Sequence, residues 1–244
     1  IMSLVAKAEN YVIQLFKDKL SSAYSFHNIE HTKRVADAVK LLADNETISD
    51  KDKEILLLSA WFHDVGYCDS CTKHENIGMQ VAEQFLKHEN VSEQEIDSVK
   101  KLINATSLNY VPQNILEKII KDADMSHVGS KDFFEITEQL RQECKEVHQQ
   151  KFTKLDWANL NLKFMAKHEY YTDYAKNNWE NKKKENIEKS KILIQELIKK
   201  KEERENSENE KSLLNRKKLE KMDSPERGIE TMFRVTLNNH TRLS

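Results

Sequence analysis

Apolar residues recur along the first 150 positions at the spacing of amphipathic helices. Val35, Val39 and Leu42 share one face, because side chains three and four residues apart lie on the same side of a helix. Residues 50–65 are apolar almost all round, which predicts a central, buried helix. Similar stripes cover residues 79–86, 96–106, 116–124 and 133–147. Strand-like alternation is absent, and only four glycines and two prolines interrupt the chain, so the sequence predicts an all-α helical bundle.

The second half of the chain is strongly charged. Neither glycine nor proline interrupts residues 155–201, which predicts a long charged helix that leaves the globular body. A thin apolar seam could pair this helix with a second copy in a homo-oligomer; it consists of Ile187, Ile194, Leu197 and Ile198. A solvated helix that frays over 202–210 fits the same residues, so both alternatives stay open. Residues 207–226 read as a linker.

Composition narrows the class of protein. The 39 basic and 41 acidic residues nearly balance, so the overall charge gives no sign of a nucleic-acid partner, and none is expected. The longest nearly apolar stretch, 55–62, is far shorter than the roughly 20 residues needed to cross a bilayer, and the first residues lack a signal-peptide pattern. Three cysteines are too few for a disulfide framework. We therefore expect a cytoplasmic protein.

Two polar residues interrupt the most apolar segment. His63 and Asp64 follow directly on it, and burying them unpaired would cost several kcal/mol. His31 lies four residues before Val35 on an apolar face, and Asp124 ends another apolar stripe. Two imidazoles and two carboxylates are a mixed nitrogen and oxygen set that suits one divalent ion of Mn, Mg, Fe, Co, Ni or Zn. Such an ion acidifies water and polarises a phosphoryl oxygen, the two tasks of phosphoester hydrolysis.

In chain order, His31, His63–Asp64 and Asp124 resemble the H…HD…D signature of the HD-domain metal-dependent phosphohydrolase superfamily over residues 1–175. The flanking strings HDVGY and DADMSHVG strengthen the resemblance. It implies an HD-domain helical bundle that hydrolyses a phosphoester, commonly in a nucleotide, with a metal-activated water. The substrate would then be a small phosphoester, and Asp64 would serve both as metal ligand and in activating the water.

The string FHNIEH at 26–31 is similar to the segment of cyclic-nucleotide phosphodiesterases whose first histidine protonates the leaving oxygen. This similarity implies that His27 is the general acid. A structural histidine, hydrogen-bonded in a loop, is the alternative that stays open.

Three more residues are candidates for substrate contacts. His74 resembles the additional histidine that many family members place beside the metal, and we expect it to contact substrate or water. Where two-metal members carry a further histidine, this chain has Asn-Ala-Thr at 104–106, so we expect a single metal ion and a substrate contact at Thr106. Lys73 is a candidate cation for phosphate. The three tryptophans are expected to pack in the core or an interface rather than to stack on a base.

The last residues carry a second resemblance. The string RGIETMFRVTLNNHTRLS at 227–244 is similar to the opening of the membrane domain of Pycsar effectors. It implies that the chain is the cytoplasmic part of a longer, membrane-anchored protein with a membrane segment beyond residue 244, linked to antiviral defence. An ordinary amphipathic helix is the alternative.

The predicted organisation is therefore an HD phosphohydrolase domain at 1–175, an extended charged helix at 176–206, a linker at 207–226 and the Pycsar-effector-like segment at 227–244. Two functions follow. The first is a metal-dependent phosphohydrolase or phosphodiesterase acting on a nucleotide or nucleotide-like phosphoester. The second is a nucleotide-sensing HD module of a membrane-associated antiviral effector with little or no turnover, which passes binding on through the long helix.

Overall fold

The computed structural model describes residues 2–222, so the segment at 227–244 lies outside the described residues. Within that range the chain is helical and contains no strand, which confirms the predicted all-α fold. The elements are α1 (Leu4–Lys19), α2 (Ile29–Asn45), α3 (Asp50–Phe62), η1 (Val65–Cys68), α4 (His74–His88), α5 (Glu93–Ala105), α6 (Ile115–Asp124), η2 (Ser126–Gly129), α7 (Phe133–His148), α8 (Lys154–Lys167), α9 (Asp173–Asn178) and α10 (Glu180–Met222).

Three helices begin at reciprocal capping pairs, formed by residues three positions apart in the sequence. At the start of α3, the Ser49 side chain accepts a hydrogen bond from the backbone nitrogen of Asp52. The Asp52 carboxylate in turn accepts one from the backbone nitrogen of Ser49. Ser92 with Glu95 repeats this reciprocal arrangement at α5, as a third pair does at α8. Each pair satisfies two backbone N–H groups that a helix start leaves without partners.

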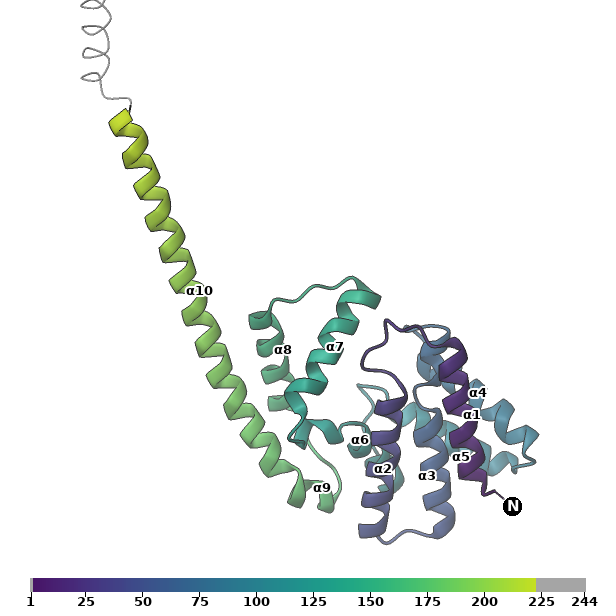
Figure 1. Ribbon diagram of the computed structural model, residues 1–244. Coiled ribbons are helices and arrows are strands. Elements are labelled where there is room, and N and C mark those ends of the chain that lie inside the picture. Colours follow the sequence, from purple (N-terminus) through teal and green to yellow (C-terminus); the bar gives the residue numbers. More distant parts are fainter. Residues whose placement is uncertain (1, 223–244) are drawn as a thin grey trace, which may run out of the picture. The chain divides into compact units, whose positions relative to one another are not determined.

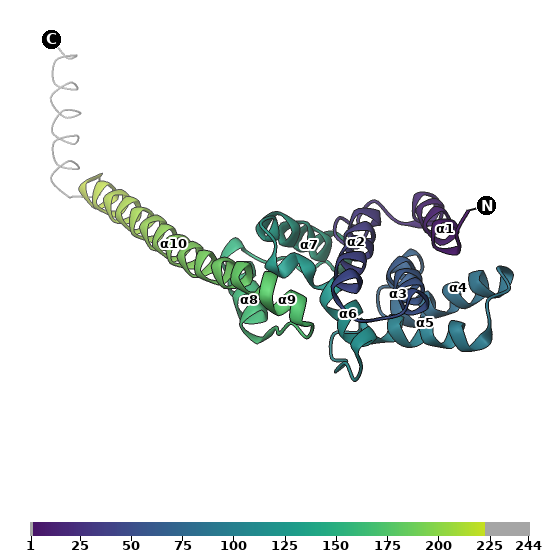
Figure 2. The ribbon, with the colours of Figure 1, turned by 90° about the horizontal axis from the view of Figure 1, so that it is seen from below.

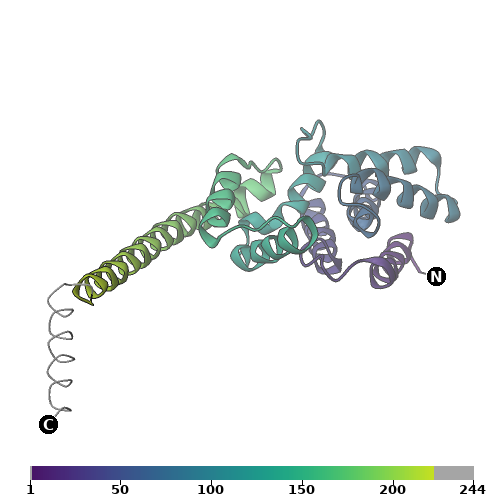
Figure 3. The same ribbon diagram turned by 90° about the horizontal axis from the view of Figure 1, so that it is seen from above.

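The core is built around α3. Every residue from 55 to 62 is buried, which confirms the predicted central helix. This helix contacts α1, α2, α4, α5 and α6. Figure 1 shows α3 between α2 and α1. Figure 2 places α7, α8 and α9 at one end of this part of the molecule and α1, α4 and α5 at the other, with α2 and α6 between them. Figure 3 shows the N-terminus at the α1 end.

The predicted uninterrupted helix over 155–201 is wrong. The chain forms α8, breaks at His168, and resumes as α9 and α10. The break is held from outside the segment, because the buried Asp122 carboxylate accepts hydrogen bonds from the backbone nitrogens of Tyr171 (3.0 Å) and Thr172 (2.7 Å) and from the Thr172 hydroxyl (2.7 Å). Thr172 then caps α9. A tertiary contact, rather than a breaker residue, therefore ends the helix.

The long charged helix itself is confirmed as α10, and it continues to Met222. Residues 207–222, which we assigned to a linker, are thus helical. Intrahelical pairs such as Lys199 with Glu203 and Lys201 with Glu205, both at 3.9 Å, support a helix with few apolar contacts. The chain divides into two compact units, at 1–193 and from residue 194 onward. Among the described residues, no helix is both long enough and apolar enough to cross a membrane.

Candidate metal centre and its cavity

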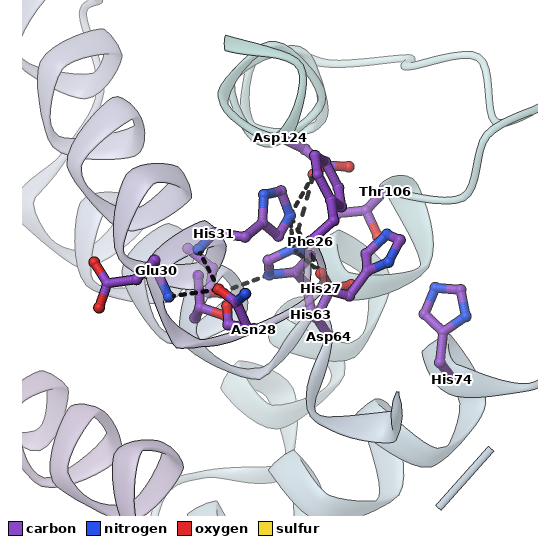
Figure 4. A network of polar contacts seen from close by, with 12 residues as sticks. Phe26, His27, Asn28, Glu30, His31, His63, Asp64, His74, Thr106 and Asp124 are labelled. Atoms are coloured by element: carbon purple, nitrogen blue, oxygen red, sulfur yellow. Dashed lines mark hydrogen bonds and ion pairs between the residues drawn. The ribbon is translucent and has the colours of Figure 1, made fainter. Parts of the chain in front are cut away.

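His31 is fixed in the first turn of α2 by the cap of that helix. The Asn28 side-chain oxygen accepts hydrogen bonds from the backbone nitrogens of Glu30 (3.0 Å) and His31 (3.3 Å). This cap starts the helix three residues before His31 and turns the imidazole inward, where it is 2% exposed. Figure 4 shows the cap and the imidazole that it positions.

His63 and Asp64 follow the last residue of α3. The His63 Nδ1 donates to the carbonyl oxygen of Ala60 at 2.7 Å, which leaves Nε2 to face the cluster. Asp64 has φ −108° and ψ 3°, so the helix has already ended there. Consecutive residues inside a helix point about 100° apart, and leaving the helix allows both side chains to reach one point.

Four side chains from three helix ends converge. The His31 Nε2 lies 3.2 Å from Asp64 Oδ2 and 3.2 Å from Asp124 Oδ1. The His63 Nε2 lies 3.1 Å from Asp64 Oδ2 and 3.8 Å from Asp124 Oδ1, and the two imidazole Nε2 atoms are 3.3 Å apart. The donor atoms of His31, His63 and Asp124 all lie within 4.8 Å of one another. Figure 4 shows this convergence.

The donor set fits a divalent cation. Asp64 Oδ2 is buried and close to both imidazoles, yet it makes no hydrogen bond of acceptable geometry. Its charge is therefore left without a hydrogen-bond donor in a buried place. The two imidazole Nε2 atoms, 3.3 Å apart, face the same point and can offer their lone pairs to one cation. Imidazole nitrogen with carboxylate oxygen is a common ligand combination for Mn, Fe, Co, Ni and Zn.

The electrostatics of the cluster point the same way. Burial by itself would lower the pKa of His63, but the carboxylates of Asp64 and Asp124 outweigh it and raise this pKa from 6.5 to about 9. Burial would raise the pKa of Asp64, but His63 and His31 hold it well below its ordinary value. The two buried carboxylates therefore stabilise a positive charge at this point. A divalent metal ion can carry that charge in place of a proton on an imidazole.

His27 and His74 lie on either side of one tyrosine. The His27 ring stacks on Tyr67 with centroids 4.3 Å apart, and Tyr67 stacks on His74 at 4.2 Å. The His74 Nδ1 donates to the Cys71 carbonyl oxygen at 3.1 Å. A Cβ atom at Gly66 would fall 2.0 Å from the His74 backbone, so only glycine allows η1 to approach the start of α4 this closely. The glycine of HDVGY therefore helps to position His74.

The comparisons with known proteins agree with this geometry. Residues 28–129 match the family described as HD domain. The chain contains an HD domain. That match covers all four residues of the cluster, and the HD domain implies metal-dependent phosphohydrolase activity in general and binding of divalent metals.

The fold is shared beyond the HD domain. A crystal structure of a Lactobacillus plantarum protein, determined as a structural genomics target, is similar with a TM-score of 0.61 and 18% identity. The similarity covers 81% of this chain and 99% of that chain. Among curated proteins, none matches the sequence significantly.

One residue outside the HD domain completes the site. Glu143 of α7 is 1% exposed and accepts hydrogen bonds from the backbone nitrogens of Phe26 (2.8 Å) and His27 (2.9 Å) and from the His27 Nδ1. Burial would raise the pKa of Glu143, but His27 and these N–H groups lower it. Our sequence reasoning missed it. The available signal was its place three residues after Leu140, on the apolar face of α7.

A cavity of about 490 Å³ opens beside the cluster. Its lining includes five residues that the sequence singled out, namely His27, Asp64, His74, Thr106 and Asp124. His31 and His63 are buried behind this surface, and Lys73 is exposed and does not line the cavity. Tyr67 and His127 line it without having been assigned a role. Burial, followed by the charge of His31, lowers the pKa of His127 to about 3, so this imidazole is neutral at physiological pH.

Proposed function

We propose that the protein is a metal-dependent phosphohydrolase that cleaves a nucleotide or nucleotide-like phosphoester with water. One observation carries this proposal: two imidazoles and two carboxylates from three helix ends converge at the wall of a cavity of ligand size. A divalent ion held by His31, His63, Asp64 and Asp124 would supply acidification of water and polarisation of the phosphoryl group.

The surrounding residues have distinct roles in this proposal. Asp64 lines the cavity as well as the cluster, so its carboxylate can orient the attacking water beside the ion. His27 lines the same cavity, and Glu143 holds its Nδ1, which leaves Nε2 to protonate the departing oxygen as the P–O bond breaks. His74 and Thr106 are assigned to contacts with the phosphoryl group or water. Thr106 donates its hydroxyl to the Ile103 carbonyl at 2.8 Å, so its oxygen can still accept a hydrogen bond.

Hydrolysis assays test the proposal. The purified protein is incubated with Mn, Mg, Co or Ni and a panel of mono-, cyclic and polyphosphorylated nucleotides. We expect metal-dependent phosphate release or ring opening that His63→Ala and Asp64→Ala abolish. His27→Gln should keep metal binding while lowering kcat by about 10²-fold or more. His88→Ala is the matched control, because the His88 side chain is 83% exposed on α4. Binding without turnover that His63→Ala leaves unchanged would contradict the proposal.

A second candidate is a nucleotide-sensing HD module with little or no turnover, such as the front part of a membrane-associated antiviral effector. The observation that favours it lies at the start of α10. The buried Asn186 amide donates to the carbonyl oxygens of Val128 (3.0 Å) and Ser130 (2.9 Å), in and just after η2, which itself follows Asp124. A change at the metal centre would thus reach α10 through few contacts. Slowed amide exchange at 180–193 on nucleotide binding, without hydrolysis, would favour this candidate.

A further inference from the structure

Two chemically different sets of residues line the cavity. One set comprises Asp64 and Asp124 of the cluster and the His27–Tyr67–His74 stack. The other set comes from α7 and α8, outside the HD domain, and forms a largely apolar wall. Its apolar side chains are Phe133, Leu140, Trp157, Leu160 and Phe164, and its polar ones are Thr137 and Asn161. Trp157, which we expected to pack in a core or interface, therefore lines a cavity of ligand size. Leu160, which is 44% exposed, lies in the same wall.

The charge of the lining is the second observation. Among the described residues, no lysine or arginine lines this cavity. Its acidic groups are Asp64, Glu75 and Asp124, and its only other titratable groups besides Tyr67 are His27, His74 and His127. A divalent ion can offset two of the three carboxylates, and no lysine or arginine of the lining offsets the third.

Two lysines, Lys121 and Lys167, line a neighbouring cavity that shares Leu108, Met125 and Phe164 with this one. The Lys121 Nζ donates to three backbone carbonyl oxygens after α5, those of Thr106 (3.4 Å), Ser107 and Leu108 (3.3 Å). Lys121 does not line the cavity, nor do Arg34 and Lys73. Sites that bind several phosphates collect Lys or Arg side chains, because each phosphate adds charge that must be neutralised. A di- or triphosphate would leave charges unpaired near the Glu75 carboxylate, at an energetic cost.

We propose that the cavity selects a substrate with a single phosphate joined to an apolar, ring-containing group, and that the α7–α8 wall binds this group. This inference rests on the proposed function, because it assigns the substrate of the same site. The phosphate lies at the cluster and the ring lies against Trp157 and Phe164. Aromatic faces favour a flat ring over a flexible chain, and the Asn161 amide in the same wall offers a donor and an acceptor to its edge.

Binding measurements test the charge preference without requiring turnover. Calorimetric titrations with AMP, ATP and ribose 5-phosphate are run at one fixed concentration of free Mn, because ATP chelates the metal. We expect AMP to bind at least about tenfold more tightly than either ATP or ribose 5-phosphate. Glu75→Gln removes one negative charge from the lining and should narrow the difference between AMP and ATP. Equal or tighter binding of ATP would overturn the charge preference.

Matched leucine variants test the wall. Leu160→Ala should weaken AMP binding about fivefold and leave ribose 5-phosphate unchanged, since only the apolar contact is lost. Leu41→Ala is the control, because Leu41 is 40% exposed on α2 and does not line the cavity. Circular dichroism confirms that both variants fold. If the Leu160→Ala and Leu41→Ala variants bind AMP with the same affinity, the assignment of the wall is overturned.

The two proposals fail differently. Selective AMP binding with no hydrolysis of any substrate would contradict the phosphohydrolase and leave the single-phosphate cavity standing. Hydrolysis of ATP, with an affinity for ATP equal to that for AMP, would support the phosphohydrolase and contradict the single-phosphate cavity.

Discussion

Glu143 holds His27 from a helix that lies outside the HD domain match. Its carboxylate accepts hydrogen bonds from the backbone nitrogens at 2.8 Å (Phe26) and 2.9 Å (His27) and from the His27 ring. The two residues are 116 positions apart. The orientation of the proposed general acid is therefore set by α7 rather than by residues 28–129.

Glu143→Gln should lower kcat and leave KM and metal affinity nearly unchanged. The amide cannot accept from all three nitrogens, so the His27 ring loses its fixed orientation while the metal ligands keep theirs. We expect a loss of roughly 10- to 100-fold in kcat. Steady-state kinetics with Glu146→Gln as control check it, because Glu146 is exposed on the same helix. An equal loss of metal affinity would instead assign Glu143 a general structural role.

Glu143 should also stabilise the fold in a pH-dependent way. Its pKa in the folded protein lies below the ordinary value of 4.5, so its contribution is present above about pH 4.5 and is lost as the pH falls through the lower pKa. At pH 7 we expect Glu143→Gln to lower the free energy of unfolding by about 1–3 kcal/mol. Urea denaturation at pH 7 and pH 3.5 measures the difference, which should shrink at the lower pH.

His168 should make the protein less stable as the pH falls from 6.5 towards 4. Burial, together with the nearby Lys183 and Lys121, lowers the pKa of His168 from 6.5 to about 4. Between about pH 6.5 and pH 4, His168 is therefore protonated in the unfolded chain and neutral in the folded chain. The loss between pH 7 and pH 5 is about 2 kcal/mol. Thermal unfolding at both values should show a flatter dependence for His168→Gln than for wild type and for the control His88→Gln.

A divalent ion should raise the thermal stability of the wild type, because it binds the assembled cluster and not the unfolded chain. At a concentration of 100 times Kd, the gain is about 2.7 kcal/mol. Asp124→Asn keeps the shape of the side chain but removes a charged ligand, so its melting temperature should no longer respond to Mn. A variant that responds as the wild type does would place the ion elsewhere.

Asn186→Ala should loosen the start of α10. The variant leaves the carbonyl oxygens of Val128 and Ser130 without their donor in a buried place, which costs about 1–3 kcal/mol. Hydrogen exchange should increase over 180–193 and at 126–130. Asn181→Ala is the control, since Asn181 is exposed on the same helix and should leave both segments unchanged.

Several elements of the fold were accessible from the sequence because their cause is local. Helix periods, capping pairs such as Ser49 with Asp52, and the buried run at 55–62 each depend on residues within a few positions of one another. The long helix over 155–201 could not be predicted correctly, because Asp122 supplies the break from some 50 positions away. Residues 207–222 were misassigned since a charged composition fits a helix and a linker alike.

The same division holds at the site. The sequence by itself determined that His31 and Asp124 belong to inward helix faces and that His63 and Asp64 follow a buried apolar helix, because a polar residue that interrupts an apolar pattern is visible in the sequence. Only the tertiary structure decided that their donor atoms meet, that Glu143 holds His27, that Lys73 stays outside and that Trp157 faces a cavity. These relations join positions far apart in the chain, and packing between helices leaves no periodic trace in the sequence.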